Sequence, residues 1–412
     1  MTNFCSDPQS EEFRSDPKFA ANTRSPTGVV VASDNPTKSY YFRRRFGFAN
    51  NLESLPGDLL SDILARLPAH GIRDSVGLVC PKWYHLTRTT DFIHAHFQRA
   101  TSGLLLYSLV FPRELIFISM KEGRVEKFTS RKEYGYDVWS SCNGLVFGSS
   151  WNNKSKLCIL NPATKQHYDL PPFCDKSYVE FYSCLAYVAA SKEYKVVLCH
   201  NVRGIGGVPA KAFTILTVGV DSSWRHVRTQ HFSETSRTLL FNDTPLTTGG
   251  FVHWVTNMSA NVLTMNVETE TISESRVPLS RDHRGKRKFY LSTGRYLTVL
   301  VALGNFSWDV WQMESETGEW LKGVGIDLED EKWKFDRFLQ DREENLVIDE
   351  GMLFVPVGWL DYPEVLVFHP PPRNHSCIVY KVRTREIDSF ELPTFGGYYI
   401  FRFHKNSLLS VG

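Results

Sequence analysis

Apolar residues follow two different patterns along this chain, and the change comes near residue 97. The first pattern has helical spacing and places five apolar residues within an arc of about 140° on a helical wheel: Leu59, Leu60, Ile63, Leu64 and Leu67. Pro56 suits the first helical position, Asp58 favours the positive end of the helix dipole, and Pro68 stops the run. The sequence therefore predicts a short amphipathic helix that ends at Leu67.

The apolar arc of this helix is wide for a helical unit of fewer than 50 residues. So small a unit buries too little surface to hold a large core alone. The arc therefore has two interpretations. It packs wholly against the helices that follow and the downstream domain, or part of it is left for a partner protein.

The segment 51–97 resembles an F-box. The resemblance rests on Leu55-Pro56-x-Asp58-Leu59-Leu60-x-x-Ile63-Leu64-x-x-Leu67-Pro68, then on Val79-Cys80-x-x-Trp83, and on Leu86 and Phe97. It implies docking on a Skp-type adaptor and, through the adaptor, on a cullin that carries the ubiquitin-transfer machinery. The residues to which it assigns adaptor contact are Leu55, Pro56, Leu59, Leu60, Ile63, Leu64, Leu67, Val79, Cys80 and Trp83.

Two departures from the usual F-box pattern concern the middle of this segment. The connection from Pro68 to Val79 is one residue longer than the common form, and Pro81 replaces the usual basic residue before Trp83. Proline has no amide hydrogen and clashes with the preceding turn, so one continuous helix through this point is disfavoured. We expect a break near Cys80, with Pro81 starting a new helix.

After Phe97 the pattern becomes one of short β-branched and aromatic runs broken by Gly, Asn, Pro and Ser. The only helical turn that we expect in residues 98–412 lies near Trp333–Leu339. A glycine precedes an apolar run at four positions, and a polar turn follows each at a variable distance. The glycines are Gly144, Gly250, Gly294 and Gly351; the turns include 161–165, 266–270, 313–320 and 381–386, with 221–225 similar.

These repeats indicate units of roughly 45–55 residues, with two units in the first gap between glycines. One four-stranded sheet cannot bury both of its faces, whereas a ring of such sheets can. The chain is therefore predicted to be mostly β, with a small helical N-terminal F-box and a β-propeller-like domain of five or six blades over residues 98–412. The alternative is an irregular pair of β-sandwiches.

The same stretch also resembles the F-box-associated, kelch-like domains common in plant F-box proteins. The motifs are Ser141-Cys142-Asn143-Gly144-Leu145, the run from Leu160 to Lys165 that closes on Leu170-Pro171-Pro172, and Glu193-Tyr194-Lys195-Val196-Val197. Their order behind an F-box is more specific than any one of them. The resemblance implies a substrate-recognition module.

Bulk properties narrow the function classes. The formal charge of +2 calls for neither nucleic acid nor an acidic membrane as a partner. Eight scattered cysteines without a C-x-x-C pair favour free thiols in a reducing compartment. Residues 1–50 are expected to be a disordered tail and linker, and without a signal peptide or a membrane span we expect a cytosolic or nuclear protein.

The sequence carries few signs of chemistry. It has no H-E-x-x-H, G-x-S-x-G or Walker motif, so no catalytic residue, metal ligand or cofactor is predicted. His94 and His96 are expected to be surface histidines, and the basic run 284–288 a solvated loop or a contact for an acidic partner. Three tryptophans in turn-rich contexts are candidate target-binding anchors, with core packing as the alternative: Trp151, Trp308 and Trp359.

Two functional hypotheses remain at this point. The first is a non-catalytic receptor subunit of a ubiquitin ligase, which docks its adaptor through residues 51–97 and holds an unidentified target protein with the β-domain. The second is a β-propeller enzyme or a lectin-like binding protein with a helical N-terminal cap. The absence of a recognisable set of carboxylates or histidines weighs against an enzyme.

Overall fold

The protein is described here from a computed structural model. The residues that it describes are 55–109, 113–121, 123–129, 135–150, 152–173, 183–203, 209–228, 245–255, 260–280, 283, 285–338, 353–369, 376–392 and 399–410. Residues 57–412 belong to one compact unit. The expected disordered tail over residues 1–50 lies outside the described residues.

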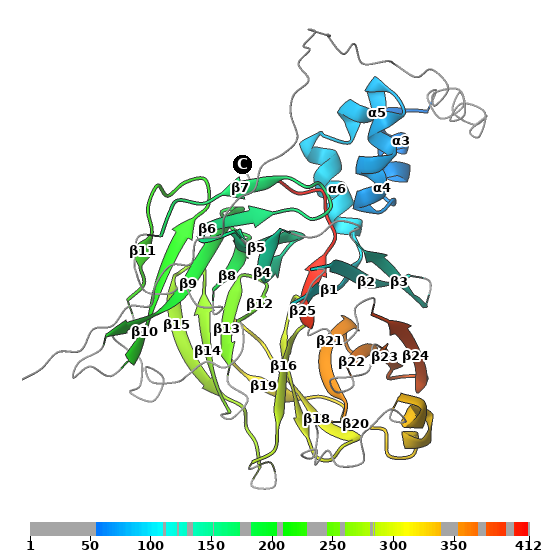
Figure 1. Ribbon diagram of the computed structural model, residues 1–412, viewed down its shortest axis with the longest axis vertical. Helices are drawn as coiled ribbons and strands as arrows, with labels where there is room; N and C mark the ends of the chain where they lie inside the picture. The colour runs from blue at the N-terminus through cyan, green and yellow to red at the C-terminus, as the bar shows by residue number, and fades with distance from the viewer. Residues whose placement is uncertain are drawn as a thin grey trace, which may run out of the picture. The chain divides into compact units, whose positions relative to one another are not determined.

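Four short α-helices and one 3-10 turn begin this unit (Figure 1). They are α3 (Gly57–Leu64), α4 (Ala69–Asp74), η1 (Val76–Leu78), α5 (Pro81–Leu86) and α6 (Thr90–Arg99). The helix predicted to end at Leu67 closes three residues earlier, in a turn where Leu67 N–H donates to Leu64 O at 3.0 Å. The break predicted at Cys80 is confirmed, because Cys80 has extended backbone and Pro81 is the first residue of α5.

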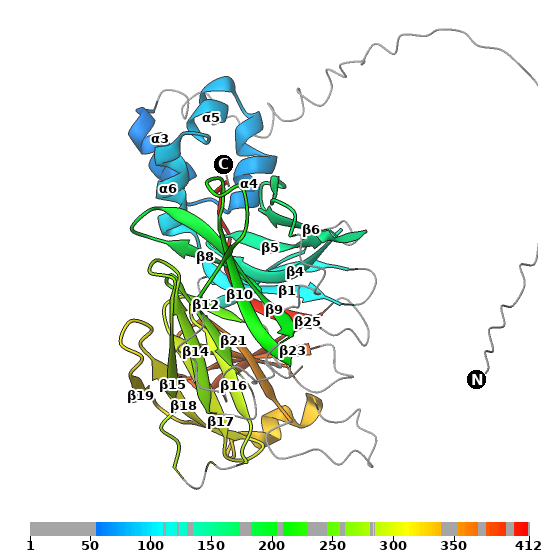
Figure 2. The same cartoon turned by 90° about the vertical axis from the view of Figure 1, so that its left-hand side faces the viewer.

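Six antiparallel sheets follow, and together they form a six-bladed propeller (Figures 1 and 2). Blade 1 has the order β25 (Tyr399–Lys405), β1 (Ser102–Ser108), β2 (Leu115–Lys121) and β3 (Arg124–Thr129). Blade 2 contains β4 (Tyr136–Cys142), β5 (Leu145–Ser150), β6 (Asn153–Leu160) and β7 (His167–Asp169). Blade 3 contains β8 (Cys184–Val188), β9 (Glu193–Arg203), β10 (Pro209–Thr217) and β11 (Arg225–His226).

The remaining three blades repeat this order from the first strand to the fourth. Blade 4 contains β12 (Leu246–Thr248), β13 (Phe251–Val255), β14 (Asn261–Asn266) and β15 (Thr271–Arg276). Blade 5 contains β16 (Lys288–Ser292), β17 (Leu297–Ala302), β18 (Ser307–Met313) and β19 (Trp320–Lys322), and β20 (Ile326–Asp327) also pairs with β18. Blade 6 contains β21 (Val355–Asp361), β22 (Val365–His369), β23 (Ser376–Lys381) and β24 (Glu386–Glu391).

The two ends of the β-domain close the ring. The first strands of the six blades contact one another in a closed circuit in the order β25, β4, β8, β12, β16 and β21. The last strand, β25, pairs antiparallel with β1 from Ser102↔Lys405 to Ser108↔Tyr399. Gly144, just before β5, has φ +87°, and a Cβ there would lie 2.2 Å from Ser407 Oγ, so the chain after β25 requires glycine at this turn.

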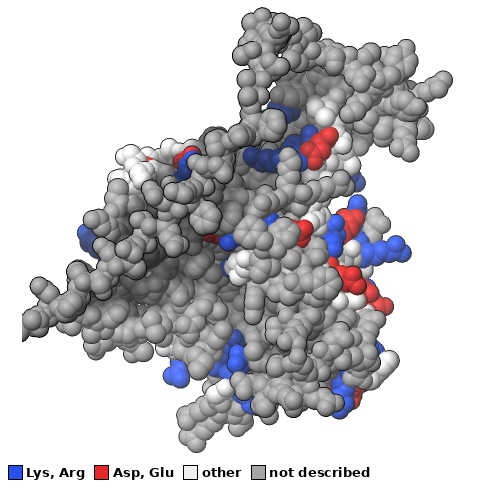
Figure 3. All heavy atoms as spheres, in the orientation of Figure 1, with Lys and Arg blue, Asp and Glu red and all other residues white. Residues whose placement is uncertain are grey.

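Apolar side chains fill all six spaces between neighbouring blades. The inner strands are therefore buried on both faces and read as continuous apolar runs, as in β17, where all six residues are buried. The outer strands differ, because β3 carries Arg124, Glu126 and Lys127. Figure 3 shows basic and acidic side chains intermixed on the right of the view, where Figure 1 places β3 and β24. Charges of this kind protect exposed sheet edges from pairing with other chains.

The repeated polar turns of the sequence join the third strand of a blade to the fourth. Asn161 Oδ1 accepts from the N–H groups of Ala163 and Thr164, and Asn266 Oδ1 accepts in the same way from Glu268 and Thr269. These hydrogen bonds close the turn through the side chain, which explains the asparagines. The prediction of a propeller is confirmed, and the count of five or six blades resolves to six.

Three further features that the sequence analysis considered are the cysteines, a helical turn in the β-domain and membrane-spanning helices. None of the described cysteines forms a disulfide: Cys80, Cys142, Cys158, Cys184, Cys199 and Cys377. The predicted helical turn near residue 333 is η4 (Lys332–Phe338). Within the described ranges, no helix has the length and apolar character to cross a membrane.

Candidate interaction surfaces

Helix α3 divides its apolar arc between the inside of the helical region and the solvent. Leu60 and Leu64 are buried, whereas Leu59, Ile63 and Leu67 keep 52%, 45% and 38% of their surface exposed. One turn of helix separates residues 60 and 64, so the two face the same way. The first interpretation of the wide arc therefore holds for Leu60 and Leu64, whereas the second, that part of the arc is left for a partner protein, stays a prediction for the exposed residues.

The exposed apolar set of the helical region comprises Leu59, Ile63, Leu67, Leu78 and Val79. Cys80 is half-buried at the start of α5, Leu55 is half-buried and Pro56 is exposed. Three residues of the predicted adaptor-contact set are instead buried: Leu60, Leu64 and Trp83. Side chains with under a tenth of their surface exposed have little area left for a partner, so in this conformation these three residues support the contact surface from beneath, and their predicted contact role stays a prediction.

Buried side chains of α6 hold the helical region together. Phe92 is buried, and Thr89 Oγ1 caps the helix by accepting from Phe92 N–H at 3.2 Å. His96 is also buried, and its Nε2 lies 3.0 Å from Leu67 O, in the turn that follows α3. Burial lowers the pKa of His96. The expectation of a surface histidine is therefore wrong at position 96, whereas His94 is exposed.

The predicted target-binding tryptophans do not lie on the surface where the structure describes them. Trp308 and Trp359 are buried in the apolar cluster between blades 5 and 6. The Trp308 ring packs 4.9 Å from the Phe368 ring, and Trp359 Nε1 donates to Thr298 Oγ1 at 3.0 Å. Both residues therefore follow the alternative of core packing, because they belong to strands β18 and β21 and not to the turns beside them. Trp151 lies outside the described residues.

Sequence reasoning missed Trp333 as an exposed aromatic anchor. Its side chain is 65% exposed on η4, in the connection from β20 to β21. Two positions on, Phe335 is buried against Phe306 and Phe354, with ring centroids 5.9 and 4.9 Å away. The helical turn separates the two aromatic residues, so that Phe335 anchors the segment and Trp333 faces solvent.

The connections between strands differ in length at the two ends of the blades. Because neighbouring strands are antiparallel, the turns from first to second and from third to fourth strand lie at the same end. These turns are short, as from Cys142 to Leu145. The six passages from blade to blade join strands at the other end, and we call the longest four the long connections: 170–183, 227–245, 277–287 and 328–354, each of which lies partly outside the described residues. The N-terminal helices lead into β1 at the short-turn end, because Ser102 pairs with Lys405 at the end of β25.

A chain of hydrogen bonds in the β15–β16 connection joins the three residue types of a hydrolytic triad. Ser280 Oγ lies 2.8 Å from His283 Nδ1, and His283 Nε2 lies 2.8 Å from Asp309 Oδ2. Lys322 Nζ shares the same carboxylate oxygen at 3.1 Å. Burial by itself raises the pKa of Asp309. The hydrogen bonds from Lys322 and His283 lower it by more, so the pKa lies below its ordinary value. His283 N–H also donates to Ser280 O, so the serine contact belongs to a local turn that Asp309 fastens to blade 5.

Comparison with known proteins identifies the β-domain. Residues 104–383 match the family described as the F-box associated beta propeller domain. An F-box protein of Arabidopsis thaliana is 25% identical over 286 residues, which span 66% of this chain and 79% of that protein. F-box protein CPR1 of the same plant is 31% identical over 159 residues, 35% of this chain and 37% of that protein.

Solved structures resemble the chain more distantly. The structure of a nidogen–laminin complex covers 74% of this chain and 99% of the matched chain, at 8% sequence identity and a TM-score of 0.42. A likeness at this level carries no argument about function.

Proposed function

We propose, since the chain belongs to the plant F-box proteins with an F-box-associated β-propeller domain, that it is the substrate-recognition subunit of a Skp–cullin–F-box ubiquitin ligase. The N-terminal helices bind the Skp-type adaptor, and the propeller binds a target protein. The subunit itself performs no bond chemistry. We place it in the cytosol or the nucleus.

The observation that best supports the adaptor contact is the exposed half of α3. Leu59 and Ile63 lie on α3, whose other leucines are already buried, and Leu67 lies in the turn that follows the helix. Exposed apolar side chains of this kind gain free energy when a partner removes them from water. The adaptor contact that we propose is therefore narrower than the sequence predicted and consists of the exposed apolar set, together with Leu55, Pro56 and Cys80.

The arrangement of the connections supports a target site at the long connections. Long surface connections carried on a rigid scaffold are where binding residues concentrate. The described strands that the long connections join begin and end at the opposite end of the blades from the point where the helices join β1. The receptor then works by proximity: it raises the effective concentration of target lysines near the ubiquitin-transfer machinery.

Co-purification with a Skp-type adaptor tests the proposal. The variant Leu59→Asp plus Ile63→Asp would bury two charges in the contact, at a cost on the order of several kcal/mol, so the complex should be lost. The matched control is Leu321→Asp plus Val324→Asp, which changes two exposed apolar residues of blade 5 and should leave the complex intact. Circular dichroism should show both variants folded.

Two results would count against this assignment. Robust adaptor binding by the α3 variant would overturn the docking surface on α3. A wild-type chain that does not bind any Skp-type adaptor would overturn the ligase role.

A further inference from the structure

A cavity of about 450 Å³ lies where the N-terminal helices meet blade 1. The helical side of its wall includes the corner between α3 and α4 and the end of α6, and the blade side is formed by β2 and β3. Its volume falls within the range of small-molecule sites, which is about 300–1,000 Å³. The cavity is therefore large enough for a small ligand that touches both parts of the protein.

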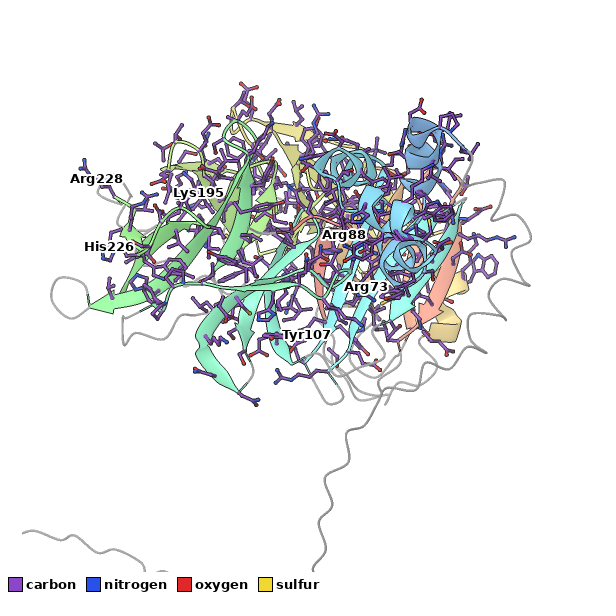
Figure 4. The ribbon with its side chains drawn as sticks, turned by 90° about the horizontal axis from the view of Figure 1, so that it is seen from above. Arg73, Arg88, Tyr107, Lys195, His226 and Arg228 are labelled. Atoms are coloured by element: carbon purple, nitrogen blue, oxygen red, sulfur yellow. The ribbon has the colours of Figure 1, made fainter. Side chains whose placement is uncertain are left out.

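Direct contacts on both sides of the cavity fix its walls. The His70 and Phe128 rings stack with centroids 4.3 Å apart and 18° between their planes. Arg73 Nη1 donates to Ala163 O in blade 2 (Figure 4). Lys405 Nζ lies 4.4 Å from the centroid of the Phe97 ring. The helices and the blades are thus held together around the cavity.

Positive charge exceeds negative charge on the cavity wall. Arg66, Arg99, Lys121 and Lys127 line it, and Glu126 is the one carboxylate among the lining residues. Nearby carboxylates compensate only part of this charge. Arg66 and Arg99 share the single carboxylate of Asp62, and Lys121 pairs with Glu126 at 3.6 Å.

Two cations at or near the cavity, the lining residue Lys127 and its neighbour Lys405, have no ion pair within the described part of the chain. Lys127 Nζ donates to a backbone carbonyl, Glu391 O, at 2.9 Å. Lys405 stands over the Phe97 ring, and burial lowers its pKa. Its charge also contributes, after burial, to the lowered pKa of His96 in the cavity wall. The site therefore has an unneutralised positive field that an anion would relieve.

His96 adds an unused hydrogen-bonding group to the wall. Leu67 O can only accept, so the Nε2 atom of His96 must be the donor in that contact. The buried Nδ1 atom has no hydrogen-bond partner among the described residues, and the same is true of His70 Nδ1. With Nε2 as the donor of a neutral ring, Nδ1 of His96 carries a lone pair and accepts, so water or a hydroxyl group of a ligand, and not a charged phosphate oxygen, can satisfy this buried atom.

We propose that this cavity binds a small polyanion of the phosphate type, which bridges α6 and blade 1. Guanidinium groups match phosphate oxygens in planar pairs and lysines add point charges, which favours phosphate esters over a single carboxylate. The ligand is either a free phosphorylated molecule or the headgroup of a lipid. Its binding would tighten the attachment of the helices to the propeller.

Calorimetric titration of the full chain with inorganic tripolyphosphate at constant ionic strength tests the proposal. We expect saturable binding, and Arg99→Gln or Lys121→Gln should each weaken it about tenfold, because each removes one charged contact. The double variant tests both walls together. The matched control is Arg276→Gln plus Arg295→Gln, two exposed arginines of blade 4 and blade 5. This control removes the same charge and should leave the affinity unchanged.

A second arm separates the two sources of the ligand. Vesicles of phosphatidylcholine with phosphatidylinositol bisphosphate are sedimented with the chain, beside vesicles of phosphatidylcholine alone. Sedimentation that the Arg99→Gln plus Lys121→Gln variant loses would assign the site to a lipid headgroup. Tripolyphosphate binding without sedimentation would assign it to a free molecule. Absence of binding in both arms, or equal loss in the control pair, would overturn the proposal.

Discussion

The helical region and the propeller solve the problem of burying apolar residues in different ways. In the propeller, each blade covers the next, and the pairing of β25 with β1 leaves no end blade without a neighbour. In the helical region, one side of α3 is covered and Leu59, Ile63 and Leu67 remain exposed. A closed ring can satisfy its own apolar surface, whereas a few short helices cannot. An exposed apolar residue is therefore stronger evidence of a binding surface in the helices than in the strands.

The largest effect on stability is expected from a substitution in the core of the propeller. Trp308→Ala removes a large buried side chain from the cluster between blades 5 and 6 and should lower the free energy of unfolding by about 3–5 kcal/mol. Trp333→Ala is the matched change at an exposed tryptophan, and its effect should stay within about 0.5 kcal/mol. Denaturant unfolding monitored by fluorescence measures both. Equal effects would contradict the description of blades 5 and 6.

Some features of both regions could be predicted from the sequence because they depend on the conformational preferences of single residues. Pro81 fixed the break before α5 because proline excludes a continuous helix whatever surrounds it. The spacing of the glycines and polar turns indicated blades for a similar reason, since Gly144 adopts the positive φ of its turn and Asn161 accepts hydrogen bonds from the backbone of its own turn. Features that depend on a few neighbouring residues were therefore accessible.

Features decided by tertiary neighbours could not be predicted from the sequence. Leu59 and Leu60 share one apolar arc, and only the position of the other helices makes one exposed and the other buried. Trp308 follows a turn by one residue and seemed to belong to it, but strand pairing with Ala302 turns its side chain into the core. The cavity beside His96 was also inaccessible, because its charges come from α3, α6, β2 and β3.

Acid should weaken the propeller through two buried histidines. His253 in blade 4 and His404 in β25 are buried, and burial lowers the pKa of each to about 3. In the unfolded chain both titrate near 6.5, so below this pH the unfolded state binds more protons than the folded state. The stabilisation by the neutral histidines is present above pH 6.5 and is lost as the pH falls from 6.5 towards 3. At pH 5 the loss should be about 2 kcal/mol per histidine.

Unfolding curves between pH 7.5 and pH 5 measure this loss. His404→Asn keeps a polar group near Ser141 Oγ, which lies 2.7 Å from His404 Nδ1, but cannot titrate. Its unfolding free energy should therefore depend less on pH than that of the wild type. The matched control His94→Asn changes an exposed histidine and should leave the pH dependence unaltered. A wild-type stability that is constant over this range would contradict the low pKa values.

The smallest expected effect lies where the two regions meet. His70 on α4 stacks on Phe128 of β3, and a pair of this kind contributes about 0.5–1.5 kcal/mol beyond the area that it buries. A double-mutant cycle with His70→Ala and Phe128→Ala should give a coupling energy in that range if the helices and the ring unfold together. The Tyr187–Tyr194 pair within blade 3 is the control, with centroids 4.9 Å apart. Coupling within blade 3 but none across the junction would mean that the helices unfold before the propeller, and the receptor would then hold adaptor and target through a flexible joint.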